Sequence, residues 1–350
     1  MKIAVYTIAL NEEQNLEAWY NSAKEADHVL ILDTGSTDDT YALAYGMGID
    51  THQQVFSPWR FDHARNHALS LLPNDIDLCI ALDMDEQLQS GWREALETFL
   101  KANPTVNRPR YKYTWSWNPD GTEGLTYAGD KIHSRNDYTW KHPVHEVLKP
   151  LNGEQQGFVP GLEIHHHPDA SKSRSQYLPL LKLAVEEDPR DDRNQFYLAR
   201  ELYFSGDYTL AQYHFSRHLD LSTWFPERAA SHRYLAKMIP DAATFHLYRA
   251  IAEDPTRRES WVDLALHYHN KHNWLACRNT ASMALAITEK PLDYLCEAEA
   301  WGWLPHDLMA VASYHLGDKA TAWHHGGEAV RLNVGDDRLR DNLKWYNIWA

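Results

Sequence analysis

Three acidic residues follow an apolar run in the segment LCIALDMDEQL, residues 78–88. A buried carboxylate without a partner is costly, so Asp83, Asp85 and Glu86 are expected at a solvated edge, beside cations or around a metal. Alternate residues of an extended chain point to the same side, which brings the carboxylates of Asp83 and Asp85 together. Because Mg²⁺ and Mn²⁺ prefer oxygen ligands, the pair predicts a divalent-cation site. A solvated turn between a strand and a helix is the alternative.

Three consecutive histidines at 165–167 offer further metal ligands. On a strand, His165 and His167 share one face and His166 lies on the other. We expect one face to add an imidazole to a metal held by Asp85, and we take His165 and His167 as the candidate ligands. The spacing leaves open which histidine binds. One buried and two exposed histidines without a metal are the alternative.

The composition excludes several classes of partner. Against 34 basic residues stand 49 acidic ones, a net charge of −15, which argues against nucleic acid or an anionic membrane as the main partner. A phosphate group bound close to the protein would then need a metal ion or a positive helix end. The three cysteines lack metal-type spacing and indicate no disulfide framework: Cys79, Cys277 and Cys296.

The amino terminus MKIAVYTIALNEEQNL has a short apolar run that turns acidic, so it reads as a first strand rather than a signal peptide. No stretch approaches the roughly 18 apolar residues of a membrane-spanning helix. We therefore expect a cytoplasmic protein without a membrane span.

The elements that must position the acidic residues form an α/β pattern. Apolar strands at 2–10, 28–33 and 78–82 alternate with helical segments, which indicates a parallel sheet covered by helices on both faces. In such sheets ligands bind at the carboxyl ends of the strands. Asn11, Asp33 and the Asp83–Asp85 pair all fall at such ends.

The pattern changes after a helix near residues 90–102. Alternate aromatic residues in PRYKYTWSW, residues 109–117, are typical of a half-buried strand. Further strand-like segments around 125–134, 143–149 and 158–167 predict a mixed or antiparallel extension of the sheet.

From about residue 172 the chain is helical and weakly repetitive. The segment NQFYLARELYFSGDYTLAQYHFSRHLDL contains two helical patterns around a glycine turn, and YHLGDKATAWHHGGEAV repeats the order. This is the layout of a tetratricopeptide repeat. We predict two domains, with the sheet in 1–171 and stacked helix pairs in 172–350.

Four motifs in fixed order carry a family resemblance: TIALNEEQNL, LILDTGSTDDT, ARN and ALDMDE. Together they resemble family 2 glycosyltransferases of the GT-A fold, whose sheet is Rossmann-like. The segments HPVHE and EIHHHPDASKSRSQYLPLL continue the resemblance more loosely. They look like the back half of those glycosyltransferases that carry a tetratricopeptide tail.

The resemblance implies a nucleotide-sugar site at the strand ends. It places Thr7, Asn11 and Glu13 around the nucleotide and Asp33 near its base, with the Gly35–Ser36 turn close by. It assigns the sugar nucleotide to Arg65, the ribose or sugar to Asp83 and the metal to Asp85. The alternatives are a helix N-terminal charge for Asp33, a salt bridge to Asp62 or Glu86 for Arg65, and first-turn helix acids for Glu12 and Glu13.

Glycosyl transfer with inversion needs a carboxylate within hydrogen-bond reach of the acceptor. In HPVHE, Glu146 is the candidate catalytic base and His145 the second. Glu123, Asp130 or a purely structural turn are alternatives.

The leading hypothesis is thus a Mn²⁺- or Mg²⁺-dependent, inverting glycosyltransferase of the hexosyltransferase type. It would use a nucleoside-diphosphate sugar, with uridine diphosphate the common choice in similar proteins, and a glycan, peptide or protein acceptor. A nucleotidyltransferase is one alternative, although the glycine-rich basic loop expected after its first strand is replaced here by ALNEEQ. A non-catalytic scaffold is the other. The helical domain is expected to recognise the acceptor or to form a homo-oligomer.

Overall fold

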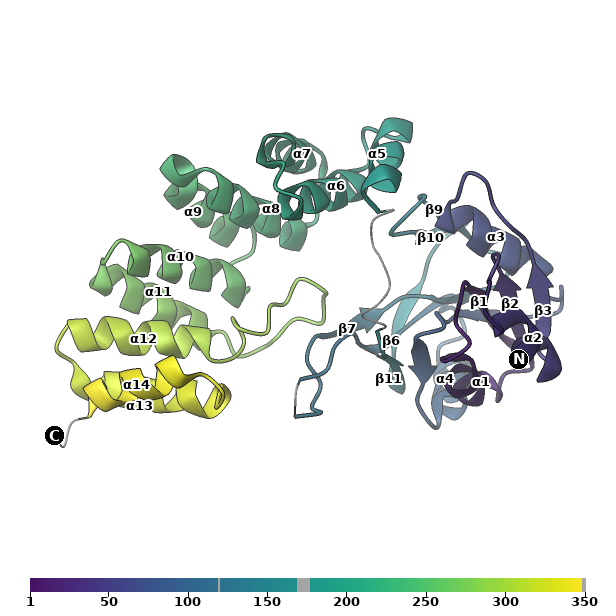
Figure 1. The fold of residues 1–350 in the computed structure, drawn as a ribbon, viewed down its shortest axis with the longest axis horizontal. Coiled ribbons are helices and arrows are strands. Elements are labelled where there is room, and N and C mark those ends of the chain that lie inside the picture. The colour runs from purple at the N-terminus through teal and green to yellow at the C-terminus, as the bar shows by residue number, and fades with distance from the viewer. Residues whose placement is uncertain (119, 169–176, 348–350) are drawn as a thin grey trace. The chain divides into compact units, whose positions relative to one another are not determined.

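The computed structural model describes residues 1–118, 120–168 and 177–347 (Figure 1). The chain divides into two compact units, Met1–Ala184 and Val185–Ala350. All strands of the described chain belong to the first unit. The predicted domain boundary between residues 171 and 172 lies outside the described residues.

The first unit is built from alternating strands and helices over its first hundred residues, followed by a run of strands. In chain order these elements are β1 (Ile3–Ala9), α1 (Leu16–Ala23), β2 (His28–Asp33), α2 (Thr40–Gly46), β3 (Asp50–Gln53), α3 (Phe61–Leu71), β4 (Leu78–Ala81), β5 (Glu86–Leu88), α4 (Trp92–Ala102), β6 (Arg108–Thr114), β7 (Thr126–Gly129), β8 (Ile132–Ser134), β9 (Tyr138–Lys141), β10 (Val147–Pro150), β11 (Gln156–His166) and α5 (Tyr177–Glu187).

The main sheet has the strand order β3-β2-β1-β4-β8. Strands β1 to β4 pair in parallel, and β8 closes one edge antiparallel to β4. The apolar sequences of β1, β2 and β4 predict this arrangement, whereas the polar β3 was not predicted. Both faces of the sheet are covered by apolar side chains, including the buried Trp19 of α1 on one face and Leu69 of α3 on the other. The carboxyl ends of β1, β2 and β4 therefore meet at one edge.

A second sheet has the order β5-β11-β6-β7. The sequence predicted an extension of the first sheet, but only β8 extends it. Strand β5 pairs antiparallel with the end of β11, with Glu86 opposite His166. The turn that contains Asp83 and Asp85 thus connects the two sheets. A separate two-stranded ribbon, β9–β10, carries the HPVHE segment in its connecting loop.

The second unit is entirely helical in its described residues. Its elements are α6 (Asp192–Phe204), α7 (Tyr208–Leu221), α8 (Phe225–Met238), a 3₁₀ turn (Pro240–Ala242), α9 (Ala243–Glu253), α10 (Arg258–Asn270), α11 (Trp274–Ala286), α12 (Leu304–His315), α13 (Lys319–Leu332) and α14 (Asp337–Tyr346).

Consecutive helices pack as pairs, α6 with α7, α8 with α9, α10 with α11 and α12 with α13. The turns inside the first and last of these pairs need a left-handed residue, and Gly206 and Gly317 supply it with φ of 85° and 80°. Asp207 and Asp318 then cap the following helices by accepting hydrogen bonds from backbone N–H groups. The unit is therefore a stack of tetratricopeptide-like helix pairs, as the repeats predicted.

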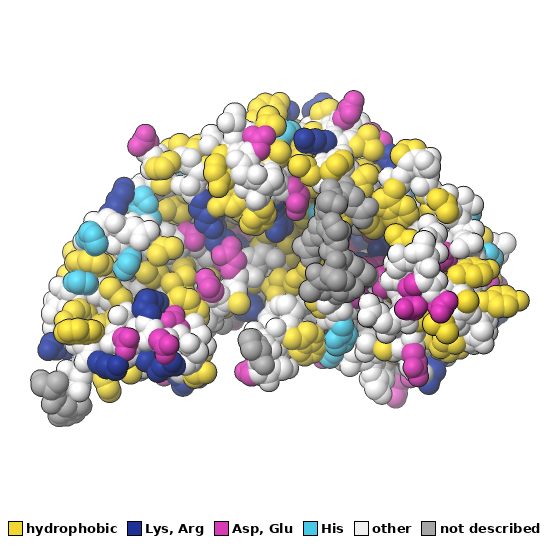
Figure 2. Space-filling model, viewed as in Figure 1, with side chains coloured by type: hydrophobic (Ala, Val, Ile, Leu, Met, Phe, Trp, Pro, Cys, Tyr) yellow, Lys and Arg dark blue, Asp and Glu magenta, His cyan; other side chains and the backbone are white. Residues whose placement is uncertain are grey.

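All three cysteines are buried and free. Among the described helices, none is long and apolar enough to cross a membrane. Acidic side chains are scattered over the face shown in Figure 2 rather than gathered in one patch, which is how the net charge of −15 is distributed there.

Candidate functional site

The loops after β1 and β2 are tied together at the strand ends. Asn11 adopts a positive φ of 55°, accepts a hydrogen bond at Oδ1 from the backbone N–H of Thr37 (2.8 Å) and donates its own N–H to Ser36 Oγ (2.9 Å). Glu13 Oε2 accepts from the N–H of Asp39 at 3.0 Å. Three residues assigned by resemblance, Asn11, Glu13 and Ser36, are thus brought together by contacts between these loops.

Asp33 lies at the end of β2 and is fully buried. Its Oδ1 accepts from the N–H groups of Gly35 and Ser36 and from Gln53 Nε2, at 3.0 to 3.1 Å. Its Oδ2 is buried without a hydrogen-bond partner among the described residues. One oxygen therefore holds the turn, and the other is available to a donor group of a ligand. Thr7, by contrast, is buried inside β1, where its hydroxyl donates to the carbonyl of Ile8.

Arg65 on α3 is the centre of the site. Its Nη2 donates to Asp83 Oδ1 at 2.6 Å and its Nε to Glu146 Oε1 at 2.5 Å, and its side chain is only 5% exposed. The guanidinium carbon also lies 5.0 Å from the centre of the Trp140 ring. Arg65 thus joins the end of β4 to the loop between β9 and β10.

The two alternative partners considered for Arg65 are wrong, because each carboxylate pairs with another cation. Asp62 pairs with Arg60 at 2.9 Å, and Glu86 pairs with Lys131 at 3.0 Å.

Lys131 is a site residue that sequence reasoning missed. Its Nζ lies 2.5 Å from Asp83 Oδ2 and 3.0 Å from Glu86 Oε1. Its backbone carbonyl accepts from the N–H of Ala81, next to the antiparallel β4–β8 pairing. No local signal marks this lysine, since only that long-range pairing brings it to the acidic turn.

Opposite charges set the ionisation of this buried cluster. Burial alone would raise the pKa of Asp83, but Arg65 and Lys131 lower it well below its usual range. Burial raises the pKa of Glu86, which also accepts a hydrogen bond from the Tyr113 hydroxyl at 2.8 Å. Glu86 Oε2 accepts from the backbone N–H of Asp83 at 2.9 Å, so this carboxyl group fixes the start of the acidic turn.

The structure corrects the expected histidine geometry. His166 Nε2, not His165 or His167, lies beside Asp85, 3.4 Å from Oδ2. The buried face of β11 runs through Leu162, Ile164 and His166, so His165 is on the opposite face, and His167 meets Asp85 through a backbone hydrogen bond of 2.7 Å. The alternation of apolar residues in LEIHH was the signal that could have shown this.

His166 is held on both sides. Its Nδ1 lies 2.9 Å from the carbonyl of Trp115, and its ring stacks on that residue at 4.4 Å. Burial lowers the pKa of His166, but the hydrogen bonds to Asp85 and to the Trp115 carbonyl raise it more, so the net shift is upward.

His165 belongs to a different group. With Glu123 and Glu163 it forms the only set of three potential metal-ligand atoms within 4.8 Å of one another in the described part of the chain. Lys112 already pairs with both carboxylates of this group, with Nζ 2.8 Å from Glu123 and 3.4 Å from Glu163. The two alternative bases are therefore ion-paired elsewhere, Glu123 with Lys112 and Asp130 with Arg108 at 2.9 Å.

Glu146 lies in the β9–β10 loop, 11% exposed and ion-paired to Arg65. The loop is tied to the start of α3, where Phe61 N–H donates to the carbonyl of Pro143 at 3.0 Å. His145, the second candidate, has a positive φ of 50°, and its ring lies 5.5 Å from that of Tyr177. Glu146 contacts Arg65, which in turn contacts Asp83.

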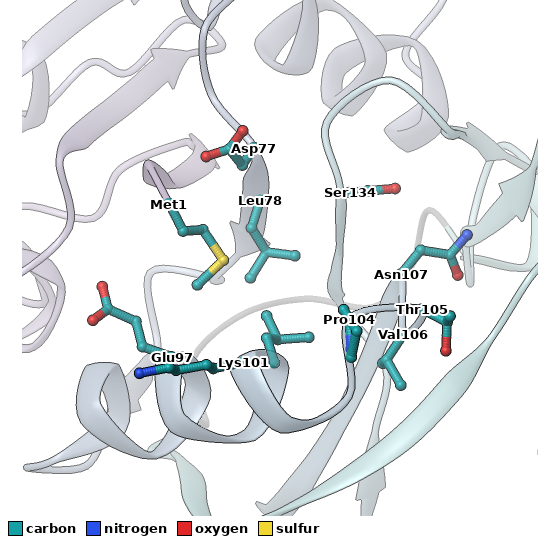
Figure 3. Close-up of a pocket in the computed structure, with 11 residues that line it drawn as sticks. Met1, Asp77, Leu78, Glu97, Lys101, Pro104, Thr105, Val106, Asn107 and Ser134 are labelled. Carbon is teal, nitrogen blue, oxygen red and sulfur yellow. The ribbon is translucent and has the colours of Figure 1, made fainter.

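A shallow hollow lies at the opposite edge of the main sheet, where Asp77 and Leu78 begin β4 (Figure 3). Glu97 and Lys101 of α4 line its other side. No predicted site residue lines it. The candidate site is therefore at the carboxyl ends of the strands and not in this hollow.

A divalent cation fits part of the acidic turn. Asp85 and His166 offer a carboxylate oxygen and an imidazole nitrogen side by side, a donor pair that suits Mn²⁺. Asp83 is a weaker candidate ligand for the cation, because its two oxygens already contact Arg65 and Lys131.

Comparisons with known proteins concern mainly the sequence of the first unit. Residues 4–151 match the sequence model described as "Glycosyl transferase family 2". The lipopolysaccharide core biosynthesis glycosyltransferase LpsC of Rhizobium meliloti (strain 1021) is 26% identical over 176 residues, which are 48% of this chain and 64% of LpsC. An uncharacterized glycosyltransferase of Rickettsia conorii is 33% identical over 112 residues, 31% of this chain and 37% of the relative. The chain thus spans less than two-thirds of the length of either.

The helical unit has similar solved structures. MamA is 15% identical, with a TM-score of 0.37 and coverage of 45% of this chain and 86% of MamA. Pseudomonas aeruginosa PilF is 15% identical, with a TM-score of 0.39 and coverage of 47% and 70%.

Proposed function

We propose, from the premise that residues 4–151 form a family 2 glycosyltransferase domain, that this protein transfers a sugar from a nucleoside diphosphate to an acceptor hydroxyl with inversion. The observation that carries the proposal is the contact of Arg65 with both Asp83 and Glu146 at the carboxyl ends of the strands. It places a carboxylate that can accept a proton next to the acidic turn on which a donor would bind.

Glu146 acts as the base. It accepts the proton of the acceptor hydroxyl while that oxygen attacks the anomeric carbon. The bond between this carbon and the diphosphate oxygen breaks, and the nucleoside diphosphate leaves with the electron pair. Arg65 holds the Glu146 carboxylate in position, and the second oxygen of Asp33 accepts a hydrogen bond from the nucleotide base.

Asp85 and His166 would hold the divalent cation, Mn²⁺ or Mg²⁺. When bound, this ion would neutralise charge on the leaving diphosphate. A protein of net charge −15 needs such local compensation to bind a diphosphate.

The favoured donor is a uridine-diphosphate sugar, and the acceptor is a glycan, peptide or protein. The name of LpsC, which assigns it to lipopolysaccharide core biosynthesis, favours a glycan acceptor. Transfer of a nucleotidyl group is less favoured, because ALNEEQ after β1 lacks a glycine-rich basic loop.

Thermal unfolding with a panel of nucleoside diphosphates tests the donor site. We expect one of them to stabilise the protein when Mn²⁺ is present, by about 2.7 kcal/mol at roughly 100 times its Kd, and much less with excess chelator. Asp85→Ala should abolish the Mn²⁺-dependent part. Asp75→Ala, an exposed aspartate paired with Lys2, is the matched control and should behave like the wild type. Equal stabilisation with and without chelator would contradict the metal bridge.

A further inference from the structure

Lys131 and Arg65 both contact the carboxylate of Asp83, each at a different oxygen. Lys131 Nζ contacts Asp83 Oδ2, and Arg65 Nη2 contacts Asp83 Oδ1. Both oxygens of the first aspartate in the acidic turn are therefore used by protein cations. This arrangement makes Asp83 a counter-ion that fixes the position of two positive charges.

Both cations keep donor capacity that the described residues do not use. Arg65 Nη1 is buried and has no hydrogen-bond partner there, in a side chain that is 95% buried. The ammonium of Lys131 has three N–H donors but two acceptors, Asp83 and Glu86, and the side chain is 27% exposed. A buried guanidinium nitrogen without an acceptor is costly, and an anionic ligand is the group that would satisfy it.

Glu86 holds Lys131 in place. This carboxyl group is 1% exposed and is fixed by the Tyr113 hydroxyl and the backbone N–H of Asp83. The buried Glu86 carboxylate therefore fixes the position of the Lys131 ammonium. This lowers the conformational entropy that the flexible lysine side chain would lose on binding a ligand.

We infer that Lys131 and Arg65 form a diphosphate-binding pair that contacts the donor directly, in addition to any divalent ion on Asp85. The inference rests on the proposed function for its ligand, a nucleoside diphosphate. The unused N–H donors of Arg65 and Lys131 would bond to diphosphate oxygens without a metal. Diphosphate binding therefore keeps a component that chelator does not remove and that Lys131 controls.

The test uses the full chain and two probes, uridine diphosphate and inorganic pyrophosphate, by isothermal titration with Mn²⁺ and with excess chelator. Lys131→Gln should weaken the binding of pyrophosphate about tenfold or more in both conditions, whereas Lys131→Arg should keep most of the affinity. Lys112→Gln is the matched control, because Lys112 also pairs with two carboxylates, Glu123 and Glu163, and should bind like the wild type.

Loss of the lysine leaves Glu86 buried without its cation, so Lys131→Gln combined with Glu86→Gln is the second variant. It removes both charges and should restore the thermal stability without restoring pyrophosphate affinity. Wild-type affinity in either Gln variant, or no pyrophosphate binding by the wild type, would overturn the inference. If pyrophosphate binding depends on Lys131 but no nucleotide sugar is turned over, the proposed glycosyltransferase function would be contradicted and the cation pair would stand. If the protein transfers sugar and Lys131→Gln keeps the wild-type pyrophosphate affinity, only the inference about the cation pair would be contradicted.

Discussion

At the scale of single residues, the site depends on one buried arginine. Arg65 links Asp83 at the end of β4 to Glu146 in a loop more than sixty residues further along the chain. Breaking a buried ion pair by removing one partner leaves an uncompensated charge and typically costs about 3–5 kcal/mol. Variants that keep the shape of each carboxyl group are therefore the informative ones.

Glu146→Gln keeps the size of the side chain and an oxygen for Arg65 but removes the basic carboxylate. We expect it to reduce sugar transfer about a hundredfold or more while nucleoside-diphosphate binding stays near the wild-type level. Steady-state transfer rates and titration of the nucleotide measure the two effects separately. Glu123→Gln is the control, because the Glu123 carboxylate contacts Lys112 and the Thr114 hydroxyl. Normal turnover by the Glu146 variant would assign the base to another residue.

Sequence reasoning found the acidic turn and Arg65 but not Lys131. Asp83 and Asp85 stand two residues apart just after an apolar strand, and this local pattern has few interpretations. Lys131 is separated from Asp83 by 48 positions, and only the pairing of β8 with β4 brings it there. Contacts between strands that are distant in sequence leave no periodic trace in either strand.

At the scale of elements, the alternation of side chains along a strand decides which of them faces the site. A strand places alternate residues on opposite faces, so an error of one residue reverses every assignment. The triple histidine was assigned from the outer two members, whereas the buried face through Leu162 and Ile164 selects the middle one, His166. The parallel pairing of β1, β2 and β4 was predictable because continuous apolar strands separated by helices have few other solutions. The polar β3 carries no such signal.

Two histidine pairs join neighbouring helices of the second unit. His232 of α8 and His246 of α9 have their Nδ1 atoms 3.1 Å apart, and those of His306 on α12 and His325 on α13 are 2.9 Å apart. Such a contact needs one ring to donate and the other to accept, which is impossible once both are protonated. Burial lowers the pKa of His232 and of His325 to about 4, with the partner histidine adding to the shift.

Acid should therefore destabilise the helical unit. In the unfolded chain these rings take up protons below about pH 6.5, but the folded pairs resist protonation until about pH 4. The stability present above pH 6.5 is thus lost as the pH falls from 6.5 towards 4. Thermal unfolding followed by circular dichroism should show this loss, and His232→Gln with His325→Gln should reduce it. His272→Asn, at an exposed position between α10 and α11, is the control and should follow the wild type. An identical pH dependence in the double variant would contradict this origin.

At the scale of the whole molecule, each unit has its own core. The apolar clusters on both faces of the main sheet contain only residues of the first unit, and the described clusters around α9 to α14 contain only residues of the second. Every proposed donor, metal and base residue lies before residue 168. The helical unit contributes none of them, and we therefore propose for it recognition of the acceptor or self-association.

A chain that ends after Glu187, the last residue of α5, separates these roles. Because the sheet unit keeps its core and all proposed donor ligands, we expect it to bind the nucleoside diphosphate with the affinity of the full protein and to hydrolyse the sugar nucleotide slowly. Transfer to the natural acceptor should fall strongly, since the helix pairs that would hold the acceptor are gone. Titration of the nucleotide is the control for folding, and the ratio of transfer to hydrolysis is the measurement. Full transfer by the shortened chain would show that the helix pairs serve assembly or targeting and that the acceptor is bound by the sheet unit alone.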